Sequence, residues 1–547
     1  MDNDPITPLK GISQDCRNRL KNTRVAVIGA GLGGLMAALR LSQHGVKVTL
    51  YEAHPQVGGR VRSNVRFANG RIIEEGAELI GSFHTAWLKL AQKYGIAMIN
   101  RMGDLEYERE RLNLKLRLDN TKDLTWAEIH QLNKDVDQVL KSIADDAAKW
   151  IVQETCPWNE TNKIVLAILK NYDNTTVRDA LINLHKVNPN NPKQQRLWKM
   201  LELRLVNDEV SQLDEMNYLG LLLKVKGGQS ERFEIDDPGR MGYWDELEIF
   251  RCADGCQRLA DEMASEIRKN RGALMLKTAV TQIEIHPQDV QLTTRSVAWP
   301  SGKLSSAGKT ARFQYVVLAV PPSVWDDVTI KDNGSAVDLK AEIGVMGRGP
   351  AVKFFSSFKR RFWITEKIPS APSGGTLKLG QIWEGTDNQV QTGRQRIVLN
   401  IFAGPTLPGS GKGASRPPTE LEMQKELKDL YPSYSRNLNK TYYSDWPNEP
   451  FIKTGYWAPK PNGEIFKVGP KLNVAFHRRL YFAGEHTYVS FFGYMEGALR
   501  SGIRAANLLM GESCGIDVLP LNRAKSNLVK FVFREENDVQ KRFTDEQ

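Results

Sequence analysis

Three glycines in the stretch VAVIGAGLGGLMAAL, Gly29, Gly31 and Gly34, have a spacing that could serve phosphate chemistry. They form a G-x-G-x-x-G pattern directly after an apolar run that is typical of a buried strand. In such a turn the first glycine permits the tight bend, the second lets a pyrophosphate approach the backbone, and the third lets the following helix pack closely. The N-terminus of that helix would offer unpaired N–H groups and partial positive charge to the phosphates.

An acidic residue, Glu52, closes the next apolar run roughly 20 residues later, where a carboxylate would hold ribose hydroxyls. A G-x-G-x-x-G pattern alone is weak evidence, because glycine turns also occur where they only pack. Here the strand, the helix and the terminal acid occur together. The sequence therefore predicts a dinucleotide-binding unit.

The stretch GGRVRS, from Gly58 to Ser63, adds two glycines and two arginines shortly after Glu52. A nicotinamide dehydrogenase has no need for a second glycine–arginine clamp at this point. The stretch resembles the signature of flavin-dependent amine oxidases, and the resemblance implies that Gly59 and Arg60 lie against the pyrophosphate or neighbouring groups. The segment IIEEGAELIG continues this resemblance with an E-x-G-A-x-x-I-G pattern.

The far end of the chain is similar to the same family. LYFAGEHTYVSFFGYMEGALRSGIRAA resembles its C-terminal flavin motif, which implies cofactor contacts for Gly484 and for Glu485, the latter toward the ribityl or pyrophosphate region. A helix beginning near Met495 would point its positive N-terminus at the edge of the flavin that becomes negative on reduction. LKTAVTQIEI resembles the strand whose Val280 backbone would bond adenine, and YVVLAVPP the strand that runs under the cofactor.

The resemblance spans residues 24 to 510 and implies FAD as the cofactor. Monoamine oxidases attach their flavin through a cysteine in the C-terminal motif, and this chain has none there. We therefore expect FAD to be bound noncovalently.

Amine oxidation by a flavin needs little side-chain chemistry, since the substrate carbon must only lie over the flavin with its nitrogen neutral. The family keeps a lysine that holds a water beside the flavin N5, and the matching position in GPAVKFFSSF is Lys353. Two aromatic positions flank the flavin face: Tyr494 fills one by register, and Trp457 or its neighbour Tyr456 fills the other. His486 lies in the motif and is at least as well explained by packing as by catalysis.

The substrate class rests on weaker similarities. Venom-type L-amino-acid oxidases carry a carboxylate-binding arginine in a G-P-M-R segment, where this chain has Ala77, Glu78 and Leu79. EIFRCADGCQRLADEMA and TGYWAPKPNGE instead resemble segments of microbial L-amino-acid oxidases, with Cys256 in place of an asparagine and Asn462 as an intruding residue. Glu78 could favour a basic substrate side chain or only orient its own loop.

These similarities predict an FAD-dependent L-amino-acid oxidase. It would transfer hydride from Cα to the flavin N5 and yield 2-oxo acid, ammonia and hydrogen peroxide, with O2 as oxidant. The carboxylate anchor is unidentified. The alternatives are an amine oxidase acting on monoamines or polyamines, a related flavoprotein that desaturates or isomerises lipid-like substrates, and a flavin-binding scaffold without catalysis.

These residues need a scaffold that brings both ends of the chain together. We expect an α/β fold, with a discontinuous Rossmann-like FAD-binding domain, an inserted mixed α+β substrate-binding domain and a helical subdomain. The predicted boundaries are 1–22 for an N-terminal arm, 23–83, 249–335 and 463–512 for the FAD-binding domain, 84–248 for the helical and first substrate part, 336–462 for the second substrate part, and 513–547 for a C-terminal tail with an amphipathic docking helix.

The composition excludes several classes of protein. The 547 residues are 41% hydrophobic and 25% charged, and the net charge of +11 is spread along the chain, so we expect neither nucleic-acid binding nor a membrane span. The N-terminus has no apolar segment, which predicts a cytoplasmic protein without a secretory signal. Five scattered cysteines favour a reducing compartment over a disulfide framework, and the Cys252 and Cys256 pair lacks the second cluster of a metal site. The sequence leaves open whether the protein is a homodimer.

Overall fold

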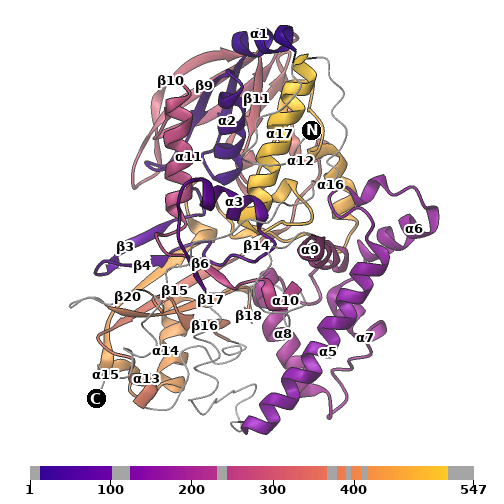
Figure 1. Ribbon diagram of the computed structural model, residues 1–547, viewed down its shortest axis with the longest axis vertical. Helices are drawn as coiled ribbons and strands as arrows, with labels where there is room; N and C mark the ends of the chain where they lie inside the picture. The colour runs from indigo at the N-terminus through magenta and orange to yellow at the C-terminus, as the bar shows by residue number, and fades with distance from the viewer. Residues whose placement is uncertain are drawn as a thin grey trace.

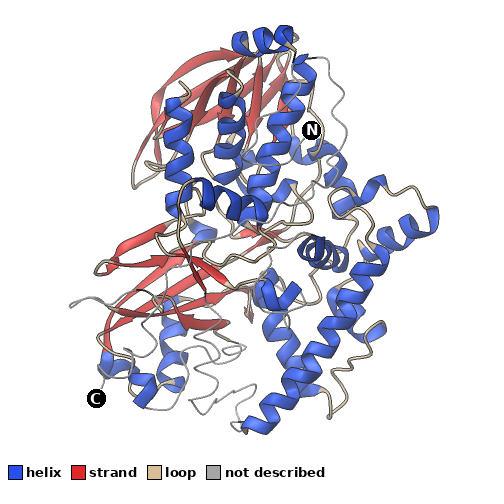
Figure 2. Ribbon diagram, viewed as in Figure 1, coloured by secondary structure: helices blue, strands red, loops and turns tan. Residues whose placement is uncertain are grey.

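A computed structural model describes residues 13–100, 124–230, 243–365, 378–387, 389, 396–408 and 415–514. One part of the molecule combines a parallel sheet with long helices, a second is an antiparallel sheet, and a third is helical (Figure 1). Strands gather in two separate groups, one above and one below the middle of the view (Figure 2). The predicted amphipathic docking helix falls within 515–547 and lies outside the described residues.

The first part is built on a five-stranded sheet in which every neighbouring pair is parallel. Its strand β1 reads RVAVI, and the last four residues are buried, as expected for a strand covered on both faces. The strands come from distant parts of the chain, which confirms the predicted discontinuous α/β architecture. In spatial order they are β22 (Leu480–Phe482), β11 (Tyr315–Leu318), β1 (Arg24–Ile28), β2 (Lys47–Tyr51) and β7 (Ala273–Met275).

Long helices pack against this sheet. Helix α2 (Leu32–Gln43) follows β1 directly and is buried along nearly its whole length, which is why its sequence is apolar on every side. Helices α11 (Gln257–Lys269) and α17 (Met495–Cys514) lie beside it (Figure 1). The first part also contains a mixed sheet, in which β12 and β8 run parallel and the other neighbours run antiparallel. Its strands are, in spatial order, β10 (Lys303–Phe313), β9 (Val290–Ala298), β8 (Thr278–Ile285), β12 (Thr329–Asp332) and β13 (Ser335–Val337).

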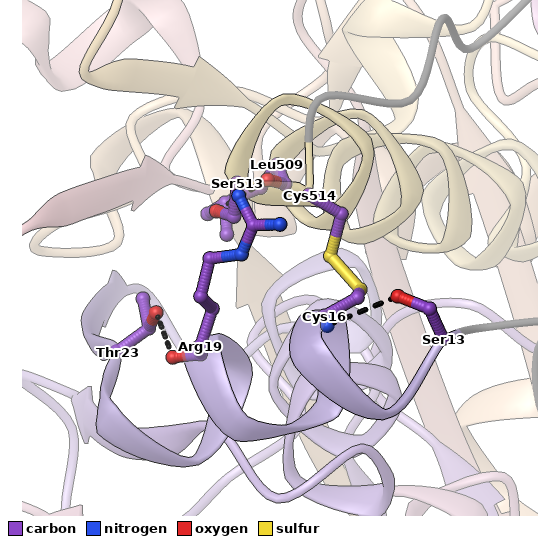
Figure 3. The surroundings of a disulfide bond; sticks show 7 residues. All are labelled: Ser13, Cys16, Arg19, Thr23, Leu509, Ser513 and Cys514. Carbon is purple, nitrogen blue, oxygen red and sulfur yellow. Dashed lines mark hydrogen bonds between the residues drawn. A yellow bond between two sulfur atoms is a disulfide. The ribbon is translucent and has the colours of Figure 1, made fainter.

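The N-terminal segment differs from its prediction. Helix α1 (Gln14–Asn22) is capped by Ser13 and buries Cys16 and Leu20, so this part of the predicted N-terminal arm is a helix packed on the first part. Cys16 forms a disulfide with Cys514 at the end of α17, with a Cα–Cα distance of 5.0 Å (Figure 3). The expectation that the cysteines stay reduced is therefore wrong for this pair. Scattered positions in sequence do not exclude a pairing that the fold brings together.

The second part is a four-stranded antiparallel sheet in the order β16 (Gln381–Glu384), β17 (Ile397–Ala403), β15 (Val352–Phe358) and β20 (Leu438–Asp445). Side chains alternate between its faces. Phe354 and Phe358 pack in the same core as Met423 and Leu427 of helix α14 (Glu420–Leu430). Lys353 consequently belongs to the opposite face.

The third part is helical and completes one large apolar core. Its longest helix, α5 (Trp126–Trp150), starts with a capping box between Thr125 and Glu128. The others are α6 (Lys163–Tyr172), α7 (Val177–Asn183), α8 (Gln195–Glu209), α9 (Tyr218–Ser230) and α10 (Tyr243–Glu246).

The remaining described helices and strands are short. They are β3 (Ser63–Ala68), β4 (Arg71–Glu74), α3 (Thr85–Lys93), β5 (Met98–Asn100), β6 (Phe250–Cys252), α12 (Leu339–Glu342), β14 (Arg348–Gly349), α13 (Phe362–Thr365), β18 (Leu407–Pro408), β19 (Ser415–Arg416), α15 (Tyr434–Asn437), β21 (Tyr456–Trp457) and α16 (Glu464–Leu472). Within the described ranges, the helices are too short or too polar to cross a bilayer.

Candidate active site

A cavity of about 200 Å³ lies where the three parts meet. A cavity needs only about 10–15 Å³ to hold one water, so this cavity can take a ligand much larger than water. One end is lined by glycines of the first part, among them Gly31, Gly58 and Gly484. The other end is lined by polar and aromatic side chains of the second and third parts.

The glycine turn has the geometry that its pattern predicts. Gly29 has φ +99°, which other residues rarely adopt, and a Cβ on Gly34 would overlap the Gly29 carbonyl oxygen. Gly31 instead has open space, because a Cβ at this residue would lie 4.0 Å from its nearest neighbour, the Gly58 carbonyl oxygen. Gly31 is also the N-cap of α2 and supplies no side-chain cap. The first N–H groups of α2 are therefore available to an anion at this end of the cavity.

Glu52 stands beside this turn. Its carboxylate accepts hydrogen bonds from the backbone N–H groups of Ala30 and His54, both at 2.7 Å, and burial raises its pKa against these bonds. The N–H of Thr278, at the start of β8, donates to the Glu52 carbonyl oxygen at 2.8 Å. Val280 follows two residues later on the same strand. Neither Glu52 nor Val280 lines the cavity. Their roles toward ribose and adenine stay predictions.

Arg60 and Glu485 form an ion pair at 2.9 Å on the cavity wall, next to Gly59 with its φ of +60°. Burial alone would raise the pKa of Glu485, but Arg60 and the hydrogen bonds that the carboxylate accepts together hold this pKa below its ordinary value. The carboxylate also accepts from the N–H of Gly493 at 2.8 Å. A fixed guanidinium thus faces the cavity near the glycine turn, as a pyrophosphate site requires.

Helix α17 begins at the cavity, since Met495 and Ala498 both line it. The positive end of this long helix therefore points into the space where the flavin ring is expected. His486, close by in sequence, does not line the cavity. Burial lowers its pKa to about 4, and its ring nitrogens have no hydrogen-bond partner among the described residues, which favours the packing interpretation.

Lys353 lines the cavity and is only 4% exposed. Its ammonium donates to the Glu78 carboxylate at 2.7 Å and to the Glu74 carbonyl oxygen at 3.1 Å. A lysine on an apolar strand needs such a partner. The sequence suggested Glu78 as a contact for a basic substrate, whereas the structure pairs it with Lys353.

One of the two aromatic residues expected beside the flavin differs from the residue that the sequence favoured. Tyr494 lines the cavity, and so does Tyr456, whose hydroxyl donates to the Asp208 carbonyl oxygen at 2.8 Å. Trp457 does not line it: its indole N–H donates to Glu464 at 2.6 Å, and the side chain is 2% exposed. Neighbouring residues of strand β21 point to opposite sides. Tyr456, the alternative left open by the sequence, therefore takes the place proposed for Trp457.

Sequence reasoning missed the polar end of the cavity. Asp208 and Glu248 line it, and Gln381 donates to Asp208 at 2.7 Å. Burial, followed by the neighbouring Glu248, raises the pKa of Asp208 to about 7. Lys224 lines the cavity as well and pairs with Glu209 at 2.7 Å. The lysine inside the apolar run of α9 was a signal that could have found this region, because such a side chain needs a buried partner.

The glycine end fits a dinucleotide on three counts: the open backbone at Gly31, the uncapped N-terminus of α2 and the guanidinium of Arg60. Comparison with known proteins agrees. The model of the family "Flavin containing amine oxidoreductase" matches residues 32–510.

The chain belongs to the flavin-containing amine oxidoreductase family.

Members of this family with similar sequences differ in substrate. The chain is 24% identical to mouse L-amino-acid oxidase over 92% of its length and 73% of that protein. It is 22% identical to pig flavin-containing amine oxidase B, over 89% of its length and 86% of that protein. It spans only 52% of the mouse lysine-specific histone demethylase 1B, to which it is 23% identical.

Solved structures with a similar fold include putrescine oxidase bound to putrescine, with a TM-score of 0.65 at 17% identity, covering 89% of this chain and 98% of that one. Cyclohexylamine oxidase from Brevibacterium oxydans gives a TM-score of 0.63 at 18% identity, covering 90% and 99%. The family match and the fit of the glycine end make FAD the cofactor of this amine oxidoreductase. The cysteines outside the disulfide, Cys156, Cys252 and Cys256, do not line the cavity, in keeping with noncovalent binding.

Proposed function

We propose that this amine oxidoreductase oxidises the carbon that bears a primary amino group in a small-molecule substrate. The observation that carries the proposal is that Lys353, Tyr456 and Tyr494 line one cavity together with the glycine turns and the start of α17. FAD, held by the glycine turns and Arg60, would supply the hydride acceptor and the path for electrons to O2. One amine, one O2 and one water then give one carbonyl product, one ammonia and one hydrogen peroxide.

The described residues have defined parts in this reaction. The two tyrosine rings form a slot that orients the amine and excludes water. Lys353 donates a hydrogen bond at the cavity wall, where family resemblance expects an ordered water. The N-terminus of α17 stabilises the negative charge that builds up on reduction.

L-amino acids are the substrates that we propose first, with 2-oxo acids as the carbonyl products. Two segments support this choice by their resemblance to microbial L-amino-acid oxidases, one running from Glu248 to Ala264 and the other containing Tyr456. The similarity to mouse L-amino-acid oxidase supports it as well. The candidate carboxylate anchor is Lys224, since only one hydrogen bond of its ammonium, to Glu209, occurs among the described residues.

A second candidate is an amine without a carboxylate, such as a polyamine. One observation favours it: each cation of the described cavity lining already pairs with a carboxylate, namely Arg60 with Glu485, Lys224 with Glu209 and Lys353 with Glu78. Asp208 and Glu248 then add negative charge, which attracts a substrate with a second cationic group.

Hydrogen peroxide release separates the candidates. The purified, FAD-loaded protein is given L-amino acids, their D enantiomers, tyramine and putrescine in air. Turnover of L-amino acids alone supports the first candidate. Turnover of tyramine or putrescine without any L-amino acid supports the second and rules out the first.

A further inference from the structure

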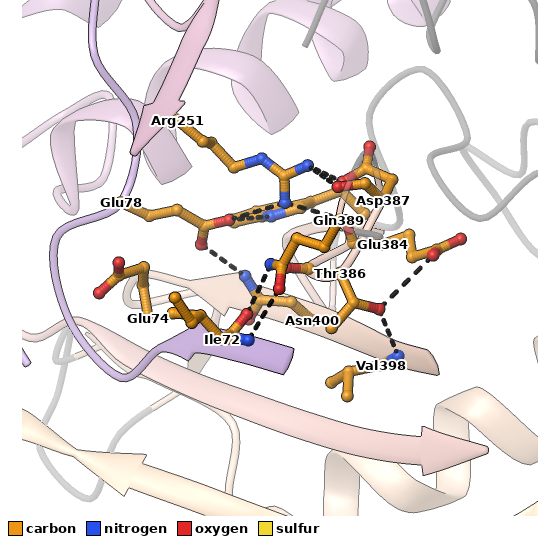
Figure 4. Close-up of polar contacts among 12 residues, drawn as sticks. Ile72, Glu74, Glu78, Arg251, Glu384, Thr386, Asp387, Gln389, Val398 and Asn400 are labelled. Atoms are coloured by element: carbon orange, nitrogen blue, oxygen red, sulfur yellow. Dashed lines mark hydrogen bonds and ion pairs between the residues drawn. The ribbon is translucent and has the colours of Figure 1, made fainter. Parts of the chain in front are cut away.

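Glu78 lines the cavity and is the centre of a buried polar network (Figure 4). It is 5% exposed, and four side chains approach its carboxylate. Lys353 donates at 2.7 Å, the Trp383 indole N–H at 3.0 Å and the Asn400 amide at 3.2 Å, while the Arg251 guanidinium lies 3.7 Å away. Both carboxylate oxygens are therefore held by donors from three different strands.

Glu78 is the anion of this network. Burial by itself would raise the pKa of Glu78, but the positive charges of Lys353 and Arg251, together with the hydrogen bonds from Lys353 and Trp383, hold it below its ordinary value. The neighbouring Glu74 behaves differently, because burial raises its pKa to about 7. The hydrogen bond from Lys353 to Glu74 goes to the backbone carbonyl, and the Glu74 side chain acts on the lysine only through the weaker charge interaction at longer range. The negative charge that faces the lysine is thus that of Glu78.

A second layer fixes the orientation of Glu78. Arg251 on strand β6 forms an ion pair with Asp387, and its Nη1 donates to the Glu384 carbonyl oxygen at 3.4 Å (Figure 4). The guanidinium cannot swing away without leaving Asp387. Because Glu78 is held from both sides, the Lys353 ammonium has one defined place on the cavity wall.

An unpaired ammonium is unfavourable in such a buried place, and a lysine there tends to lose its proton. We propose that Glu78 is a positioning residue that keeps Lys353 charged and fixed, so that Lys353 acts toward FAD as a permanent positive charge and hydrogen-bond donor and not as the base that deprotonates the substrate amine. This inference rests on the proposed function only for the presence of FAD in the cavity. It leaves Glu78 unavailable as the contact for a basic substrate side chain.

The first test measures the free energy of unfolding of the apoprotein for Glu78→Gln, Lys353→Met and the double variant. Breaking one partner leaves a buried charge unpaired, so we expect Glu78→Gln to be less stable than the double variant. The matched control is Glu384→Gln, which breaks the buried pair of Glu384 with Arg361 at 2.7 Å outside the cavity. The losses of unfolding free energy in Glu384→Gln and in Lys353→Met should simply add in the variant that combines them. A double variant that unfolds as easily as Glu78→Gln would overturn the proposal.

The second test measures how fast photochemically reduced FAD in the protein is reoxidised by O2 between pH 8.5 and 10.5, above the pKa of about 7 of Asp208 and Glu74. No substrate is needed, so the result does not depend on which amine is oxidised. A fixed positive charge stabilises the negative charge that develops on O2 reduction. We therefore expect a flat profile for the parent protein, for Glu78→Asp, which keeps the carboxylate, and for Glu384→Gln.

Glu78→Gln should lose rate by about tenfold as the pH rises and approach the slow, flat profile of Lys353→Met. The sign follows from the charge, because the ammonium is present at low pH and lost at high pH. A flat profile for Glu78→Gln that matches the parent would refute the proposal. If Glu78→Gln does not fold, the double variant decides: folding of the double variant supports charge pairing, and its failure to fold assigns Glu78 to the scaffold alone.

Discussion

Alanine substitutions at Gly34 and Gly31 distinguish an effect on protein stability from an effect on FAD binding. In Gly34→Ala, the new methyl group would overlap the Gly29 carbonyl oxygen and lie 3.1 Å from the Ala319 Cβ. Both of these neighbours are parts of the packed sheet region, so α2 must move away from β1. Overpacking of this kind costs about 1–3 kcal/mol of unfolding free energy. FAD affinity falls as a consequence.

Gly31→Ala meets no such obstacle. The nearest atom lies 4.0 Å away and φ is −68°, so alanine is sterically allowed. As an N-cap, alanine costs about 1 kcal/mol or less relative to glycine. The methyl group nevertheless occupies the space that a pyrophosphate would approach. We expect a nearly unchanged stability of the apoprotein with FAD affinity lowered by about tenfold or more, equivalent to about 1.4 kcal/mol.

The assay has two readouts on each variant, chemical unfolding of the apoprotein and fluorescence titration with FAD. Gly34→Ala should lose in both, and Gly31→Ala mainly in the second. Parent-like FAD affinity in a folded Gly31→Ala protein would show that the phosphates do not lie on this turn, and the assignment of the glycine end would fail.

Three further outcomes follow from the same structure. Tyr456→Ala should lower kcat/KM for the amine by about tenfold or more while FAD stays bound, whereas Trp457→Phe should mainly lower stability; equal kinetic losses in both would contradict the placement of the slot. Replacement of Cys16 and Cys514 by serine should lower the unfolding free energy by about 2–4 kcal/mol, and a variant as stable as the parent would show that the pair is not bonded in solution. Because the pKa of Asp208 is raised to about 7, its carboxylate becomes charged as the pH rises through 7, and KM for a cationic amine should fall over this range. Asp208→Asn should remove this pH dependence of KM. An unchanged profile in that variant would exclude Asp208 as its source.

Local patterns predicted the nucleotide-binding end of the site well. Strand β1, the turn at Gly29 and helix α2 are consecutive in sequence, and each has a pattern that its neighbours reinforce. The pairing of β1 with β11, far along the chain, follows because the second apolar strand has nowhere else to bury both faces. Lys353 was identified by its match to the lysine of the family, and its place on an apolar strand agrees with a buried, paired side chain.

Features that depend on tertiary register were not predictable. Tyr456 and Trp457 are neighbours on a strand of two residues, and the sequence gives no reason to prefer one face over the other. Cys16 and Cys514 are 498 residues apart, and their pairing requires α1 to lie on the end of α17. Asp208 ends a helix without any motif around it, so only the fold shows that it reaches the cavity.

Anaerobic mixing tests the central claim most directly. The FAD-loaded protein is combined without O2 with each substrate that released peroxide and with a panel of L-amino acids and cationic amines, and the visible absorbance of the flavin is followed. We expect the yellow colour to bleach with at least one of them and to return when air is admitted. A protein that binds FAD yet stays yellow with every amine would contradict amine oxidation in this cavity.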